Sequence, residues 1–180
     1  MNSNDLKLNQ IQVIGSHNSY RIHPVQDMFN LMTGLNPELA AELDYGHPSF
    51  DVQFSQHGIR QIEIDVYHDP EGGLFYNQRG NLFIGLPVPS GIEELLDPGL
   101  KVLHFPDIDY RTHYLTFIDA LTAVKTWSDA NPNHIPIFIL VEAKEDGLVN
   151  VYPSLSGFTQ PLPFDRDALD AIDADIRSVF

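Results

Sequence analysis

Short apolar segments separated by long connections constrain the fold of this chain more than any other feature of its sequence. Four segments have the length and composition of strands, namely residues 11–15, 61–67, 101–105 and 135–142. The second alternates with period two, placing Ile62, Ile64 and Val66 on one face and polar residues on the other. Main strands joined by long or helical connections generally pair in parallel. The sequence therefore predicts an α/β fold assembled from β-α units.

Two segments show helical periodicity. Residues 113–130 space their apolar side chains as a helix does, and Asn131-Pro132-Asn133 stops the pattern. Residues 165–179 predict a second helix. A local hairpin is also predicted, in which residues 74–78 and 82–84 turn at Gly80-Asn81.

Composition limits the class of protein. The chain has 180 residues, of which 43% are apolar, so it is long enough to build a core. The longest apolar runs fall short of the roughly 20 residues that a bilayer span needs. There is no cysteine, which excludes disulfides, thiolate metal sites and a cysteine nucleophile. Residues 1–10 lack the apolar core of a signal peptide; a leader removed before residue 1 would still fit the secreted or periplasmic location that we expect.

The net charge of -15 argues against two kinds of partner. A nucleic-acid-binding protein should carry a basic footprint, and none is visible. Electrostatic docking onto an anionic membrane is disfavoured for the same reason. The acidic residues either form a solvated surface or hold a cation, and composition alone does not decide between these readings.

The positions of the polar residues are more informative than their number. In a parallel β/α barrel the carboxyl ends of the strands meet at one mouth, where catalytic groups gather. The four strand segments would bring these residues there: His17, Asn18, Glu63, Asp65, His104, Glu142 and Lys144.

The chemistry of that set points to a hard cation. Three crowded carboxylates repel one another unless a cation lies between them or some are protonated. Oxygen ligands without a thiolate favour calcium or magnesium over zinc. Asn18 and the three carboxylates could form such a shell, while two histidines beside a cation suit acid/base work on a phosphodiester.

Four segments carry a family resemblance: GSHNSY, EIDVYHDPEGG, VLHFPDIDYRTH and ILVEAKED. In this order they resemble the bacterial calcium-dependent phosphatidylinositol-specific phospholipase C family, over roughly residues 11 to 146. The resemblance implies a TIM-type (β/α) barrel with His17 and His104 as the catalytic pair. It also implies Ca²⁺ as cofactor and Lys144 as the residue that binds the inositol headgroup or its phosphate. The implied calcium ligands are Asn18, Glu63, Asp65 and Glu142.

The resemblance also implies a reaction. The inositol 2-hydroxyl of phosphatidylinositol, or of a related inositol phospholipid, attacks the phosphodiester, releasing diacylglycerol and a cyclic inositol phosphate. Glu63 or Glu142 takes the hydroxyl proton, His104 protonates the leaving oxygen, and His17 stabilises the phosphoryl oxygens. The partners implied are this lipid and a transient membrane contact, with no nucleic acid; the oligomeric state is left open.

The length suggests an incomplete barrel, because such barrels take ~250 residues. We expect a single domain over residues 1–180 holding about the first four β/α units of a partial TIM-type barrel; pairing of two copies and a shortened product are the alternatives. Two other functions stay open at this stage. One is a glycerophosphodiester phosphodiesterase, although that family usually has His-Arg-Gly where this chain has His17-Asn18-Ser19. The other is a module that binds calcium and inositol phosphate without turnover.

Other polar residues are predicted to have structural roles. Asp107 and Asp109 should organise the turn after residue 105. Surface or packing positions are predicted for His23, His47, His57, His68, His113 and His134.

Overall fold

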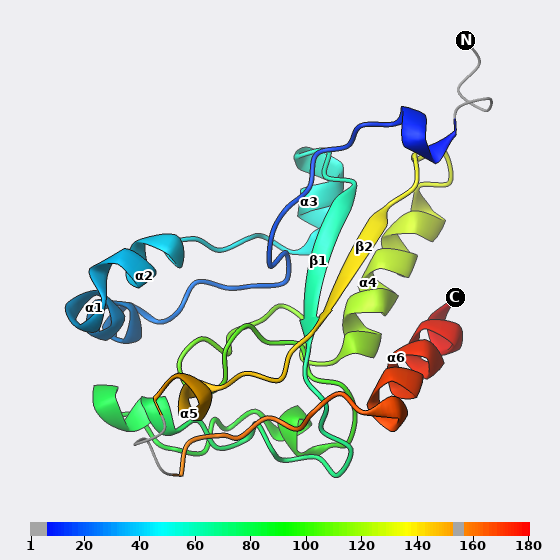
Figure 1. Cartoon of the computed structure of the whole chain (residues 1–180). Helices are drawn as coiled ribbons and strands as arrows, with labels where there is room; N and C mark the ends of the chain where they lie inside the picture. Colours follow the sequence, from blue (N-terminus) through cyan, green and yellow to red (C-terminus); the bar gives the residue numbers. More distant parts are fainter. Residues whose placement is uncertain (1–6, 153–156) are drawn as a thin grey trace.

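A computed structural model describes residues 7–152 and 157–180 of the chain. Among these residues the fold is mixed α/β, with a two-stranded parallel sheet and helices around it (Figure 1). In chain order the elements are η2 (Leu8–Gln10), α1 (Gln26–Leu35), α2 (Pro37–Glu42), α3 (Phe50–Gln56), β1 (Gln61–Val66), η3 (Arg79–Ile84), η4 (Glu93–Leu96), α4 (Phe117–Ala130), β2 (Phe138–Ala143), α5 (Leu148–Val151) and α6 (Arg166–Val179).

The two strands pair along their whole length, from Gln61 opposite Phe138 to Val66 opposite Ala143. The alternation predicted for β1 is confirmed: Ile62, Ile64 and Val66 are fully buried in the main core. β2 begins at residue 138, later than predicted, because Pro136 has no N–H to donate to a ladder. The parallel pairing places Glu63 of β1 opposite Leu140 and Asp65 opposite Glu142, near the end of β2.

Helix α4 packs against β1 and α6 packs against α4, and both predicted helices are confirmed (Figure 1). α4 starts at Phe117, four residues after the predicted start, because Thr116 caps it by accepting a hydrogen bond from the Asp119 backbone N–H. α6 is capped by Asp165 and packs against α4 with its apolar residues. Within the described ranges, no helix is both long enough and apolar enough to cross a bilayer.

Two of the four predicted strands are wrong. Residues 11–15 make only a single parallel bridge, from Gly15 to Gln61. Residues 101–105 make isolated antiparallel bridges: Lys101 pairs with Tyr67, and the next residue bonds the backbone of Leu115 instead of another strand. Lys101 is fully buried with its ammonium 3.7 Å from Asp69, so this segment is anchored by an ion pair as well as by apolar packing.

The predicted hairpin at Gly80-Asn81 is also wrong, because these residues lie in the 3-10 helix η3. A Cβ on Gly80 would lie 2.1 Å from the Asp107 carbonyl oxygen, which shows how closely the two backbones pass. The described residues thus contain two strands instead of four. The partial barrel, and a single domain over residues 1–180, stay predictions.

Candidate active site

β1 is the central element of the site. On one edge it pairs with β2, where Asp65 lies opposite Glu142. On its other edge runs the segment that follows Gly15: the Ser19 N–H donates to the Glu63 carbonyl (3.1 Å), and the Glu63 N–H donates to Ser19 Oγ (2.9 Å). Residues far apart in sequence therefore meet at the carboxyl end of β1.

The predicted acidic cluster forms in the structure. Glu63, Asp65 and Glu142 each offer a carboxylate oxygen, and these oxygens all lie within 4.8 Å of one another. Asp65 is fully buried and Glu63 nearly so, whereas the Glu142 side chain is 46% exposed. The cluster thus has a desolvated half on β1 and a solvated half on β2.

Lys144 lies among these carboxylates. Its Nζ is 3.6 Å from Asp65 Oδ2 and 3.5 Å from Glu142 Oε1. Burial raises the pKa of Asp65 to about 6, and the Lys144 ammonium acts in the opposite direction. A positive charge at this point offsets part of the cost of burying a carboxylate.

Asn18 completes the oxygen set. Its backbone is left-handed (φ 48°), a conformation that asparagine tolerates better than most residues. Its Nδ2 donates to Tyr45 Oη (2.8 Å), while its Oδ1 faces both Asp65 carboxylate oxygens at 3.3 Å. Turning the amide over would replace this repulsion with hydrogen bonds from Nδ2 to Asp65, while Oδ1 would accept from Tyr45 Oη (2.8 Å) and His104 Nε2 (3.3 Å). Oδ1 facing carboxylates is favourable when a cation lies between them, so this amide orientation is compatible with a metal ion held by Glu63, Asp65 and Glu142.

The two predicted histidines lie in contrasting surroundings. The His17 side chain is 70% exposed, with Nε2 3.8 Å from Glu63 Oε2 and Nδ1 3.2 Å from Tyr45 Oη. The His104 side chain is 16% exposed, and its Nδ1 lies 2.7 Å from Asp109 Oδ2. The structure brings both rings to the acidic cluster, since His104 Nε2 is 3.3 Å from the Asn18 amide.

Asp109 was predicted to organise a turn, and it also holds two side chains of the site. Its backbone does close that turn through two hydrogen bonds with Phe105. Its side chain is fully buried, and Oδ2 also accepts a hydrogen bond from Arg21 Nε at 2.7 Å. Sequence reasoning missed Arg21, which follows the GSHNSY segment directly, because a pattern of residue types cannot tell a buried arginine from a surface one.

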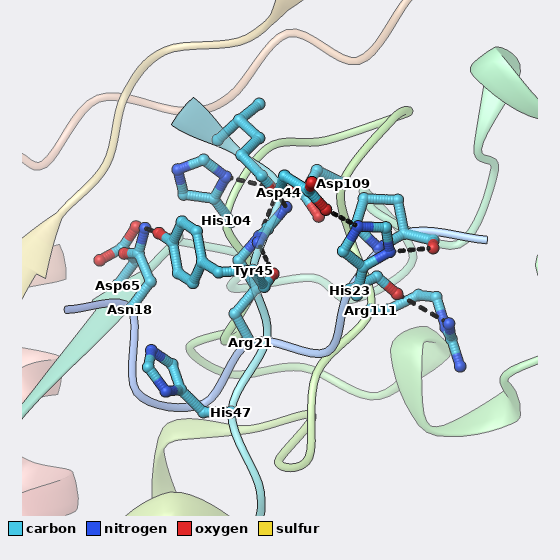
Figure 2. Close-up of polar contacts among 12 residues, drawn as sticks. Asn18, Arg21, His23, Asp44, Tyr45, His47, Asp65, His104, Asp109 and Arg111 are labelled. Atoms are coloured by element: carbon cyan, nitrogen blue, oxygen red, sulfur yellow. Dashed lines mark hydrogen bonds and ion pairs between the residues drawn. The ribbon is translucent and has the colours of Figure 1, made fainter. Parts of the chain in front are cut away.

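Tyr45 is a second residue that sequence reasoning missed. Figure 2 shows its ring between Asn18 and Arg21, with its hydroxyl directed toward Asn18. Burial raises the pKa of its phenol. Tyr45 belongs to an irregular segment between α2 and α3, where neither periodicity nor spacing gives a signal.

Two of the histidines predicted to be structural hydrogen bond to the backbone near the site. His47 Nε2 hydrogen bonds the His17 carbonyl (2.9 Å), and His113 Nε2 hydrogen bonds the His47 carbonyl (2.7 Å). Burial lowers the pKa of His47, which favours its neutral form. His47 thus supports the backbone of a site residue.

This arrangement has the groups that phosphodiester cleavage needs. It combines an oxygen-only cation shell, a histidine whose Nδ1 is held by a buried carboxylate, and an exposed second histidine. A carboxylate that accepts from Nδ1 fixes the ring orientation and leaves Nε2 for proton transfer.

Comparison with known proteins gave one family match. A model described as "Phosphoinositide phospholipase C, Ca2+-dependent" matches residues 6–180. Neither the curated proteins nor the solved structures that were searched contain a match.

Proposed function

Because the chain belongs to the Ca²⁺-dependent phosphoinositide phospholipase C family, we propose that it cleaves the phosphodiester bond of phosphatidylinositol. The products are diacylglycerol and a cyclic inositol phosphate. The observation that carries the proposal is the meeting of three carboxylate side chains and two histidines at the carboxyl end of β1. A glycerophosphodiester phosphodiesterase would have similar carboxylates and histidines, but it would belong to a different family from the one that this chain matches.

The proposed calcium ligands are Asn18, Glu63, Asp65 and Glu142; the Asn18 amide lies 3.3 Å from both Asp65 carboxylate oxygens. Calcium bound there would offset the negative charge that develops on the phosphoryl oxygens. The chain's own residues carry the proton transfers. Glu63 or Glu142 accepts the proton of the inositol 2-hydroxyl as its oxygen forms a bond to phosphorus.

His104 is the proposed general acid. Asp109 holds its Nδ1–H, so Nε2–H can donate to the diacylglycerol oxygen as the bond from that oxygen to phosphorus breaks. His17 is exposed and donates to the phosphoryl oxygens. Lys144, whose Nζ is 3.6 Å from Asp65 Oδ2, is proposed to contact the phosphate or the inositol headgroup.

We propose that this chain forms the first part of a (β/α) barrel domain. Its substrate is an inositol phospholipid, so it must contact a membrane surface, at least transiently. Its net charge of -15 disfavours nucleic acid as a partner.

The test measures diacylglycerol release from phosphatidylinositol vesicles, with calcium and with a chelator. We expect release that requires calcium, and a cyclic phosphate detectable by ³¹P NMR. His17→Ala and His104→Ala should each lower the rate by about 100-fold or more, since acid/base groups typically contribute factors of 10² to 10⁴. His57→Ala, an exposed histidine at the end of α3, is the matched control and should behave as the unsubstituted chain does.

Release that is equally fast with chelator would contradict the proposal. No release together with intact calcium binding would show that this chain is a binding module, and loss of both would refute the assignment of the metal site.

A further inference from the structure

We propose that Tyr45 is a positioning residue that selects the calcium-binding orientation of the Asn18 amide, an inference that rests on the proposed calcium site. Asn18 can serve calcium only through Oδ1, because Nδ2 carries two hydrogens and no lone pair for a metal. The two orientations of an amide have nearly the same shape, so sterics cannot choose between them. The choice must come from the hydrogen-bonding groups around it.

The Tyr45 hydroxyl can make that choice because it has a single proton. Its oxygen lies 2.8 Å from the Asn18 amide and 3.2 Å from His17 Nδ1. When its proton is donated to His17 Nδ1, its oxygen can only accept, so Nδ2 is the Asn18 atom that can bond to it. His104 Nε2, 3.3 Å from the same amide atom, also accepts from Nδ2 while the His104 proton is on Nδ1, against Asp109. Oδ1 then faces Asp65, where the carboxylates gather.

The same chain of hydrogen bonds sets the His17 ring. A ring that accepts at Nδ1 carries its proton on Nε2, the atom that lies 3.8 Å from Glu63. Tyr45 thus directs the donor nitrogen of His17 and the acceptor oxygen of Asn18 toward the acidic cluster together.

Arg21 holds Tyr45 in place. Its guanidinium lies 4.6 Å from the centre of the Tyr45 ring and donates to the Tyr45 and Leu43 carbonyls. Arg21 is itself fully buried and anchored by Asp109, the partner of His104. A buried cation over the ring and bonds to the backbone fix an irregular segment that has no helix or strand to support it.

The test is calcium binding by calorimetry, without substrate, to the unsubstituted chain and to Tyr45→Phe. Loss of the hydroxyl should weaken calcium binding by about 10-fold, the lower end of the effect of removing a group that orients a metal ligand. Tyr114→Phe is the matched control: it also removes a hydroxyl that bonds within the protein, to the Phe50 N–H at 2.8 Å, but it should leave calcium affinity unchanged.

The Asn18→Asp background separates a positioning role of Tyr45 from a merely structural one, because only a positioning role depends on residue 18 being an amide. A carboxylate presents oxygen whichever way it turns, and aspartate also tolerates the left-handed backbone. In the Asn18→Asp background, Tyr45→Phe should change calcium affinity by no more than about twofold, giving a clear coupling between the two positions.

Equal losses in both backgrounds, or a Tyr45→Phe variant that binds calcium as tightly as Tyr114→Phe, would overturn the proposal. So would an unsubstituted chain that binds no calcium. Because no turnover is measured, a chain that binds calcium but releases no diacylglycerol would refute the proposed reaction and leave this inference standing.

Discussion

Strands β1 and β2 pair residue for residue, yet their surroundings are very different. Five of the six residues of β1 are buried, whereas none of the six in β2 is. β1 has the segment after Gly15 on one edge and β2 on the other, while Leu140 of β2 leaves 53% of its surface exposed. Asp65 and Glu142 are partners in register, but only Asp65 is removed from water.

Because of this contrast, the carboxylates of the candidate site differ in how they are stabilised. Carboxylates on β1 are desolvated, so they depend on nearby positive charge, from Lys144 or from a bound cation. Glu142 on β2 is stabilised by water whether or not a cation is present. We infer that the carboxylates of β1 contribute most of the affinity for a cation, and that Glu142 of β2 contributes less.

The largest expected difference between the strands concerns stability. Ile64→Ala on β1 should lower the free energy of unfolding by about 2–5 kcal/mol, because it leaves a cavity in the core. Leu140→Ala on β2 should cost no more than about 0.5 kcal/mol, since that side chain is half exposed. Urea denaturation followed by circular dichroism measures both. Similar losses for the two variants would show that β2 is covered in solution.

A second difference should appear in calcium affinity. Asp65→Asn removes a buried charge and should weaken binding by about 100-fold or more. Glu142→Gln removes a solvated charge and should weaken it by about 10-fold. Calorimetry at neutral pH compares the two affinities. A larger loss of affinity in Glu142→Gln would contradict the inferred difference between the strands.

A smaller effect is the stabilisation of the whole chain by calcium. At a free concentration ten times its Kd, calcium should raise the free energy of unfolding by about 1.4 kcal/mol. Thermal unfolding with calcium and with chelator measures this shift. At the same calcium concentration, Asp65→Asn should show almost none of it, and a full shift in that variant would place the bound ion elsewhere.

The sequence predicted what depends on local pattern. Period-two alternation located β1, helical periodicity located α4, and the two-residue spacing within β1 identified Glu63 and Asp65 as neighbours on one face. The strand predictions for residues 11–15 and 101–105 were wrong. A short apolar segment can be buried equally well as irregular chain when its backbone groups hydrogen bond elsewhere.

The parts of the site that sequence reasoning missed depend on tertiary contacts. Arg21 bonds Asp109, 88 residues away, and Tyr45 reaches His17 from an irregular connection. Periodicity reports only which face of an element is apolar, so it carries no information about such partners. Their roles become visible only when the three segments are seen together.

The parallel register that sets Asp65 opposite Glu142 also has a consequence for the order of folding. These residues are far apart along the chain, and parallel pairing over such a distance forms slowly because a long loop must close first. The complete cation shell therefore exists only once most of the chain has folded. Calcium should then mainly lower the unfolding rate, which lengthens the lifetime of the native state, and leave the refolding rate almost unchanged.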